Sequence, residues 1–312
     1  MPELPEVETI VRGLARRVVG DQIESVWIGS RPQPLKSPAA AIARTLEGKQ
    51  IIRVHRAGKH IVFELGAEPA KSEGPKAKVS EFSRIGAARR GKWRKKAQPL
   101  DPEEPGHCRN QGEGAAQWIV HLGMTGRIVV CDSSVEVVKH THLIAKLASG
   151  RELRFVDPRM FGKLSVHAGG FDPGGLEPLE MSEKSFAELF RGRKTPIKSA
   201  LLNQKLVRGV GNIYADESLF RAGIRPRRRA AAVTRHELSK LYRAVRLVLR
   251  EAIKLGGSSV SDYVDADGEE GLFQVRHRVY GREGEPCLVC GTAIRRVVLA
   301  GRGSHYCPKC QK

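Results

Sequence analysis

The sequence predicts an α+β fold in which a leading helix and a β-sandwich or barrel precede a helical domain and a small cysteine-rich module. Short β-branched runs separated by glycine-containing turns fill most of residues 1–168. Helical periodicity takes over beyond residue 182, and four cysteines cluster close to the C-terminal end. A chain of 312 residues is long enough for two or three domains with cores of their own.

The first ten residues, MPELPEVETI, predict a helix that begins near Pro5. Proline suits the first turn of a helix, and Glu6 and Glu8 complement the positive end of the helix dipole. Apolar residues then recur at spacings of three and four, at Val7, Ile10, Val11, Leu14 and Val18. This pattern accounts for the helix but not for the Met-Pro-Glu that precedes it.

The rest of residues 1–168 reads as strands of an N-terminal domain. The strand-like runs lie in QIESVWIGS, QIIRVHRAGKHIVFEL, QWIVHLGMTGRIVV, HTHLIAKLASGRELRFVDP and GKLSVH. The following HAGGFDPGGLEPLEMS concentrates glycine and proline, so we expect a linker over 169–181.

One segment interrupts the strand pattern. Residues from about 66 to 116 are rich in Lys, Arg, Gly, Pro and Glu, and RIGAARRGKWRKK (84–96) has seven basic residues and no acidic one. The composition predicts a disordered basic insertion. It serves either as an arm that adds phosphate contacts to DNA or as a solvated insertion without a function, and the sequence leaves both alternatives open.

Helical signals mark residues 182–280 as a second domain. SEKSFAELFR predicts a short helix, and Thr234 with Glu237 forms a capping box in front of a longer one. The apolar face of that longer helix consists of Leu238, Leu241, Val245, Val248, Leu249 and Ile253. Gly256-Gly257 predicts its end.

The cysteines predict a metal site in a module over 281–312. Cys287 and Cys290 form one C-x2-C pair, and Cys307 and Cys310 form a second after a spacing of sixteen residues. This spacing is typical of a structural zinc ion held by four thiolates, one per chain, and the alternative is a set of redox dithiols or disulfides. Four cysteines leave no open position on the metal, which argues against a zinc-dependent enzyme. Cys108 and Cys131 lie apart from the cluster.

The charge of the chain favours a polyanionic partner. Against 34 Asp and Glu there are 54 Lys and Arg, which gives a net charge of +20. Such a balance is typical of nucleic-acid binding, although a generally basic protein is the alternative. No apolar run approaches the length of a membrane span, and the acidic N-terminal segment lacks the pattern of an export signal.

A glycine turn in the helical domain strengthens the nucleic-acid hypothesis. Gly209-Val-Gly211-Asn212 joins two apolar stretches, and we expect Asn212 to cap a helix from Ile213 onward. Backbone N–H groups at such a turn form an anion site suited to phosphate, although GVGN alone is most often just a turn.

Seven motifs in order resemble the formamidopyrimidine-DNA glycosylase family. They are MPELPEVET, the GK of AGKH, HLGMTGR, DPRMFG, GVGNIYADESLF, VYGREGEPC and GSHYCPKC. The resemblance covers nearly the whole chain except the insertion at about 66–116. It implies an N-terminal β-sandwich, a helix–two-turn–helix domain and a zinc finger of β-hairpin type. It also implies a monomeric, bacterial, cytoplasmic enzyme, associated with the nucleoid through DNA, that removes oxidised purines such as 8-oxoguanine and formamidopyrimidines from duplex DNA in base excision repair.

The resemblance also explains the Met-Pro-Glu start. Removal of Met1 would expose the secondary amine of Pro2, and an α-amino group has a pKa of about 8, against about 10.4 for a lysine. An unprotonated fraction of this amine can attack sugar C1′, and the resulting iminium drives β- and δ-elimination. Glu3 resembles the acid–base residue of the family. Burial would raise its pKa and a neighbouring cation would lower it, and the sequence does not decide between the two.

Further roles follow from the resemblance, residue by residue. The residues implied to hold phosphates around the extruded nucleotide are Lys59, His121, Asn212 and Arg302, of which Lys59 and Arg302 belong to the catalytic group. The residues implied to fill the gap left by the flipped base are Met124, Arg159 and Phe161, with Arg159 on the orphaned cytosine. Core packing is the alternative for Met124 and Phe161. Lys198 resembles a lysine near the lesion, Glu6 a supporting residue, and 258–277 the loop over the flipped base.

The sequence departs from the family pattern in the insertion and at Leu272, where many relatives carry an aromatic residue. Two alternatives to the implied function stay open. One is the same chemistry with a preference for oxidised pyrimidines, as in the endonuclease VIII branch. The other is a non-catalytic protein that binds damaged DNA.

Overall fold

A computed structural model describes residues 1–66, 116–259 and 270–312 of the chain. The predicted basic insertion and part of the predicted loop over the flipped base lie outside these described residues. Helix α1 (Leu4–Val18) starts as the sequence predicts, with Glu3 at its N-cap, Pro5 in its first turn and Glu6 accepting a hydrogen bond of 2.7 Å from the Glu3 N–H. Its apolar face is buried in the core of the following strands.

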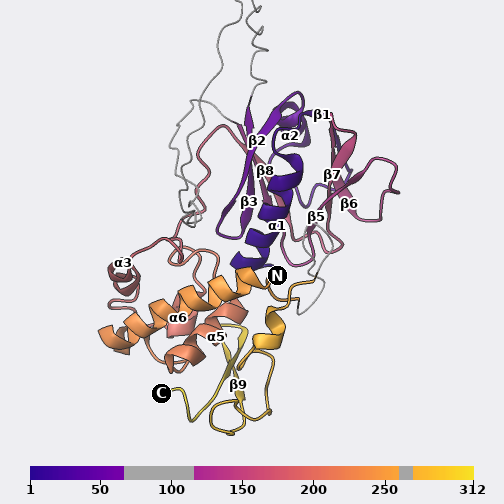
Figure 1. The fold of residues 1–312 in the computed structure, drawn as a ribbon. Coiled ribbons are helices and arrows are strands. Elements are labelled where there is room, and N and C mark those ends of the chain that lie inside the picture. Colours follow the sequence, from indigo (N-terminus) through magenta and orange to yellow (C-terminus); the bar gives the residue numbers. More distant parts are fainter. Residues whose placement is uncertain (67–115, 260–269) are drawn as a thin grey trace, which may run out of the picture. The chain divides into compact units, whose positions relative to one another are not determined.

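Two four-stranded antiparallel sheets form the predicted N-terminal sandwich, with α1 beside them (Figure 1). The first sheet has the order β1 (Ile23–Ile28), β6 (Thr141–Leu147), β7 (Arg151–Val156) and β5 (Arg127–Asp132). The second has the order β2 (Gln50–Ala57), β3 (His60–Gly66), β4 (Ala116–His121) and β8 (Lys163–His167). The strands form two separate sheets that share one core with α1, so the sandwich is the correct alternative and the barrel is not.

Strand pairing shows which two strands the insertion separates in the sequence. Strands β3 and β4 are neighbours in register from His60 opposite His121 to Leu65 opposite Ala116. Residues 67–115 therefore connect two adjacent antiparallel strands, and pairing of β3 with β4 brings Lys59 and His121 to the same end of the sheet.

A short helix that the strand pattern concealed lies between β1 and β2. Helix α2 (Ala39–Leu46) buries Ile42 and Leu46 against the sandwich core. Its eight residues supply only two buried apolar positions, a signal too short to stand out from the flanking strands.

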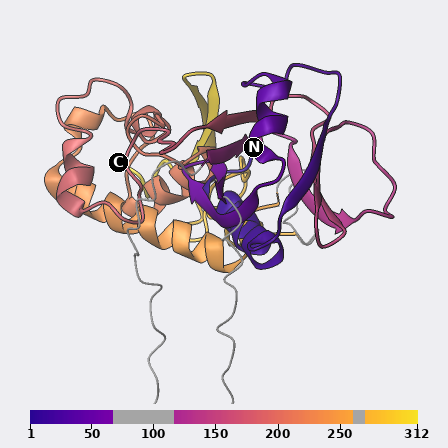
Figure 2. The ribbon, with the colours of Figure 1, turned by 90° about the horizontal axis from the view of Figure 1, so that it is seen from above.

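The helical region contains α3 (Glu183–Glu188), α4 (Ile197–Leu201), α5 (Asn212–Ala222) and α6 (Arg235–Lys254). The predicted capping box of Thr234 and Glu237 opens α6, which ends before the Gly256-Gly257 pair. Leu4 of α1 is buried in the core of this region, and α6 runs next to α1 (Figure 2). The start of the chain is thus packed into the helices as well as the sandwich.

The C-terminal segment folds as a β-hairpin of β9 (Arg295–Leu299) and β10 (Arg302–Tyr306) between the two cysteine pairs. Its small core includes Phe220, Val279 and Ile294 beside the cysteines. Among the described helices, none is long and apolar enough to cross a membrane.

Candidate active site

The start of α1 is held against the glycine turn of the helical region. The Leu4 N–H donates to the Gly209 carbonyl at 3.0 Å. Gly209 has a φ of +85°, and a Cβ there would lie 2.8 Å from the Leu4 side chain. A Cβ on Gly211 would lie 2.1 Å from the carboxyl carbon of Glu3. The GVG sequence is therefore required by the close approach of residues 3 and 4.

The Glu3 carboxylate occupies the N-terminus of α5. Its Oε1 accepts from the Ile213 N–H at 3.2 Å, and the Tyr214 N–H also donates to the carboxyl group. The sequence predicted these N–H groups as a phosphate site with Asn212 as the cap. The cap prediction is wrong, because Gly211 is the N-cap. The Ile213 and Tyr214 N–H groups donate to the Glu3 side chain, and the predicted phosphate contact of the turn stays a prediction.

Burial decides the direction in which the pKa of Glu3 shifts, the question that the sequence left open. The residue is 4 % exposed, and its Oε2 has no hydrogen-bond partner among the described residues. Burial raises the pKa of Glu3 above its ordinary value, and this effect outweighs the opposite effects of Lys59 and the Ile213 and Tyr214 N–H groups. The site therefore holds a carboxyl group that gives up its proton less readily than an exposed glutamic acid.

Lys59 lies in the turn between β2 and β3 and is 6 % exposed. The pKa of Lys59 is lowered below its ordinary value, mainly by burial. The negative charge of Glu3 opposes this shift, and the positive charge of Arg302 adds to it. Two cations from opposite ends of the chain thus act on the same small region around Glu3.

Glu6 connects three segments beside Glu3. It accepts from the Tyr214 hydroxyl and, at 2.8 Å, from the Ser258 N–H, in addition to the Glu3 N–H. Burial and the neighbouring Glu3 charge raise the pKa of Glu6 to about 7. A Cβ on Gly257 would lie 2.9 Å from Glu6, so this glycine is also needed for close packing. The supporting role predicted for Glu6 agrees with these contacts.

Lys198, predicted to lie near the lesion, is buried at 1 % exposure. Its Nζ lies 2.7 Å from Oδ1 of Asp216 and donates to the Gly303 carbonyl at 2.8 Å. The Asn212 side chain donates to the same carbonyl at 3.0 Å. Burial lowers the pKa of Lys198, and the charge of Arg302, the exposed residue before Gly303, adds to this effect.

The three predicted gap-filling residues lie in two adjoining turns. A Cβ on Gly123 would lie 2.5 Å from the Phe161 carbonyl carbon, so the turns touch. Met124 is 43 % exposed and Phe161 is 51 % exposed, which excludes the alternative of core packing. The Arg159 guanidinium lies over the Phe161 ring at 4.9 Å from its centroid.

His121 ends β4 with a neutral ring. Burial, followed by the charges of His60, Lys163 and Lys59, lowers the pKa of His121 to about 4. Its Nδ1 lies 3.1 Å from the Gly123 N–H, which donates to it and leaves the ring proton on Nε2. His121 therefore offers a neutral hydrogen-bond donor at neutral pH.

The four predicted cysteines converge on one point. Their sulfurs lie within 4.8 Å of one another, with 3.9 Å between Cys287 and Cys310 and 3.5 Å between Cys290 and Cys307. A tetrahedral zinc with Zn–S bonds of about 2.3 Å has S···S edges of about 3.8 Å. The sulfur geometry fits one structural zinc ion, which would fix the two cysteine turns at the base of the hairpin.

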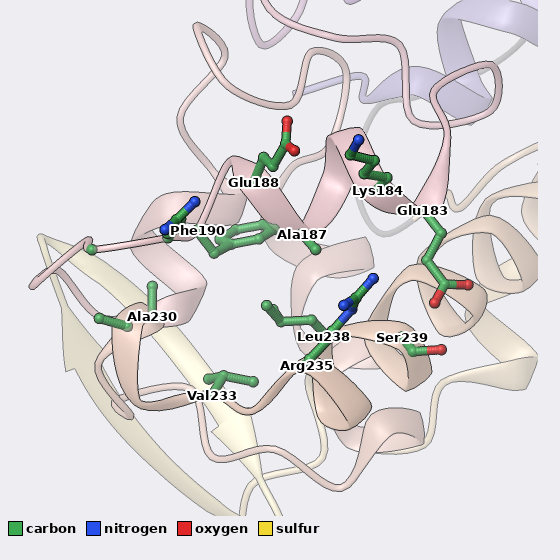
Figure 3. A pocket seen from close by; sticks show the side chains of 13 residues that line it. Glu183, Lys184, Ala187, Glu188, Phe190, Ala230, Val233, Arg235, Leu238 and Ser239 are labelled. Atoms are coloured by element: carbon green, nitrogen blue, oxygen red, sulfur yellow. The ribbon is translucent and has the colours of Figure 1, made fainter.

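The sequence predicted no individual role for Tyr214, Ser258, Asp216 or Glu217. Asp216 and Glu217 are fully buried on α5, although they stand as adjacent acids in a segment that also reads as an ordinary amphipathic helix. Two charges next to apolar neighbours are the only local signal. A pocket of about 600 Å³ between α3 and the first turn of α6 (Figure 3) contains none of the predicted site residues among its described lining.

The chain matches three family models in order along its length. The Formamidopyrimidine-DNA glycosylase N-terminal domain matches residues 1–164, the Formamidopyrimidine-DNA glycosylase H2TH domain matches residues 175–264, and the Zinc finger found in FPG and IleRS matches residues 284–312. These matches define the class: a DNA repair glycosylase with a zinc finger.

Full-length relatives define the family. The Formamidopyrimidine-DNA glycosylase of Solibacter usitatus is 40 % identical over 322 residues and covers 100 % of both chains. A complex of a Lactococcus lactis FPG mutant with a Fapy-dG containing DNA has a TM-score of 0.78 at 30 % identity, covering 100 % of both chains. The wild-type Lactococcus lactis FPG with an oxidized pyrimidine containing DNA has a TM-score of 0.77 at 31 % identity and the same coverage. The chain belongs to the formamidopyrimidine-DNA glycosylase family.

Proposed function

We propose that this chain is a monomeric, bifunctional glycosylase and AP lyase that excises oxidised purines, such as 8-oxoguanine and formamidopyrimidines, from duplex DNA. The observation that carries the proposal is the buried Glu3 carboxyl group with its raised pKa, directly after Pro2 and anchored to α5. An acid that keeps its proton beside an amine is what glycosidic cleavage with a covalent intermediate requires.

In the proposed reaction the Pro2 amine, free after removal of Met1, attacks C1′ of the damaged nucleotide. The bond from C1′ to the base breaks, and the C1′–O4′ bond of the sugar ring then breaks as the ring opens. The proton lost by the attacking amine and the proton of Glu3 end on the leaving base and on the ring oxygen. The nitrogen of Pro2 is then part of a cationic iminium. Loss of a proton from C2′ expels the 3′-phosphate, and a second elimination expels the 5′-phosphate.

The remaining predicted residues serve DNA binding in this proposal. The charge of Lys59 acts on Glu3 and the charge of Arg302 acts on Lys59, and both side chains would hold phosphates next to the reacting sugar. His121 and Asn212 would add neutral donors. The exposed Met124, Arg159 and Phe161 would enter the gap left by the flipped base, where Arg159 would hydrogen-bond the orphaned cytosine.

A preference for oxidised pyrimidines is the second candidate. The related Lactococcus lactis FPG has been crystallised with an oxidized pyrimidine containing DNA, and Leu272 departs from the family pattern at an exposed position. Both candidates use the same nucleophile and acid, so they differ in which duplex reacts faster.

The test is borohydride trapping on a duplex with 8-oxoguanine opposite cytosine, followed by mass mapping of the crosslinked peptide. We expect a covalent adduct on Pro2. An adduct that forms only with an oxidised pyrimidine would support the second candidate, and an adduct on a lysine would remove Pro2 from the mechanism. Tight binding without an adduct on any lesion would make the chain a non-catalytic DNA-binding protein.

A further inference from the structure

A buried polar cluster joins α4 and α5 to the zinc hairpin. The Asp216 carboxylate is fully buried and contacts three polar groups, which belong to Lys198 on α4 and His305 on β10. Its Oδ1 lies 2.7 Å from the Lys198 ammonium, and its Oδ2 accepts from the His305 N–H at 2.9 Å, with the His305 ring at 3.3 Å. One carboxylate thus holds a lysine of α4 and the backbone of β10 together.

A single carbonyl on the hairpin completes the cluster. The Gly303 oxygen accepts from Lys198 at 2.8 Å and from Asn212 at 3.0 Å. Gly303 follows Arg302 directly, and a Cβ on Gly303 would lie 2.9 Å from the Arg296 side chain on the opposite strand. The backbone beside Arg302 is therefore fixed from both sides, by the cluster and by β9.

We propose that Asp216 is a positioning residue that sets the place of Arg302 through Lys198 and the Gly303 backbone. The inference rests on the proposed function, in which Arg302 holds a phosphate beside the reacting sugar. Lys198 then acts mainly inside the protein, because two donors of its ammonium are engaged and the side chain is 1 % exposed.

The positions of Lys198 and the Gly303 carbonyl should depend strongly on the negative charge of Asp216. A buried ammonium without its carboxylate is strongly unfavourable, so Lys198 would shift or lose its proton once the charge is removed. The Gly303 carbonyl would then lose one of its two donors, and the hairpin tip would move with it. A displacement of about 1 Å at a positioning group can lower a rate by about a hundredfold.

The experiment is a double-mutant cycle between Asp216→Asn and Arg302→Ala, read as the single-turnover rate of iminium trapping on 8-oxoguanine DNA. We expect Asp216→Asn to lower this rate at least about tenfold in the natural background and less than about twofold beside Arg302→Ala, because both changes remove the same contact. The same cycle on the Kd of a duplex with a tetrahydrofuran abasic analogue gives a second readout that needs no chemistry.

Glu217→Gln is the matched control. Glu217 is the next residue on α5, equally buried, and its carboxylate accepts from the N–H groups of Arg278, Val279 and Tyr280 at 2.9 Å each. It ties the same helix to the segment before the first cysteine pair instead of to the hairpin. We expect this variant to lower the Tm, with an effect on the trapping rate that is the same with and without Arg302.

A double variant separates the positioning role of Asp216 from a general loss of stability. Lys198→Met combined with Asp216→Asn removes the uncompensated charge, so we expect the Tm to recover while the trapping rate stays low. An Asp216→Asn effect of equal size in both Arg302 backgrounds, on the rate and on Kd, would overturn the inference. No trapping by the natural chain would instead count against the proposed function, and the Kd cycle would still decide the role of Asp216.

Discussion

Two groups of predicted site residues differ in how the protein holds them. Around the start of α1, Glu3 and Glu6 are buried and hydrogen-bonded to three residues in two other segments. At the turns after β4 and β7, Met124 and Phe161 are exposed, and the Arg159 guanidinium makes a cation–π contact with the Phe161 ring. We call the first the buried group and the second the exposed group.

The two groups differ in whether folding or DNA binding supplies the interactions that hold their side chains in place. The buried group is organised by the protein before any substrate arrives, and the desolvation that raises its carboxyl pKa values is a folding effect. In the proposed function, the exposed group gains further partners from DNA. Changes in the buried group should therefore alter stability and chemistry together, whereas changes in the exposed group should alter recognition alone.

Loss of zinc should have the largest effect. Cys290→Ser removes one of four ligands, and structural zinc contributes roughly 10 kcal/mol or more to the folding of such modules. The core beside the cysteines is small, so we expect the hairpin to unfold and DNA affinity to fall at least about a hundredfold as the Arg302 and Gly303 contacts are lost. Zinc release assays and Kd measurements check this, and unchanged binding would make the module incidental.

Replacement of the acid should have the next largest effect. Glu3→Gln keeps the shape at the start of α5 but cannot donate a carboxyl proton, so we expect 8-oxoguanine excision to fall by about 10²–10⁴. Trapping on DNA that already contains an abasic site should fall less, since no base has to leave. Equal losses on both substrates would assign Glu3 to a step after base release.

The pH dependence of stability should identify Glu6. Its pKa is raised from 4.5 to about 7, so the folded state binds a proton more tightly than the unfolded state. The contribution of Glu6 is therefore fully present below pH 4.5 and is lost as the pH rises through 7, by on the order of 3 kcal/mol. The difference in unfolding free energy between the natural chain and Glu6→Gln should follow this curve. A Met124→Ala variant should leave the curve unchanged, and a flat difference for Glu6→Gln would contradict the assignment.

Discrimination of the opposite base should depend on Arg159. We expect Arg159→Ala to reduce the preference for cytosine opposite the lesion by about tenfold, the size of one good side-chain contact to a base. The Tm should stay within about 1 °C of the natural value, since the side chain is exposed and its removal leaves no cavity. Arg127→Ala, on an exposed position of the same region, is the control, and an equal loss there would make the effect one of general charge.

The smallest effect is expected at His121. With a pKa of about 4 the ring is neutral at pH 7, so it releases no counterion on binding phosphate. His121→Gln should leave the salt dependence of DNA binding unchanged, whereas Arg302→Gln should reduce the slope of log K against log salt by about 0.9. A reduced slope for His121→Gln would mean that DNA binding protonates the ring.

Local sequence patterns predicted most of the helices and strands because interactions between neighbouring residues determine where these elements begin and end. The α1 start, the Thr234–Glu237 capping box and the four-cysteine spacing each depend on a few neighbouring residues. The cap at Asn212 was predicted wrongly because the group that binds the α5 start, Glu3, is more than two hundred residues away in sequence. Helix α2 was missed because eight residues between strands give too weak a period.

The sequence by itself determined the order of the parts and the zinc ligands, and through the motif resemblance it predicted part of the candidate site but not Asp216 or Glu217. Only the tertiary structure decided which of them are buried and therefore how they titrate. Glu3 holds a raised pKa, His121 is neutral and Lys198 is bound to Asp216, because desolvation and contacts between distant segments exist only after the chain has folded.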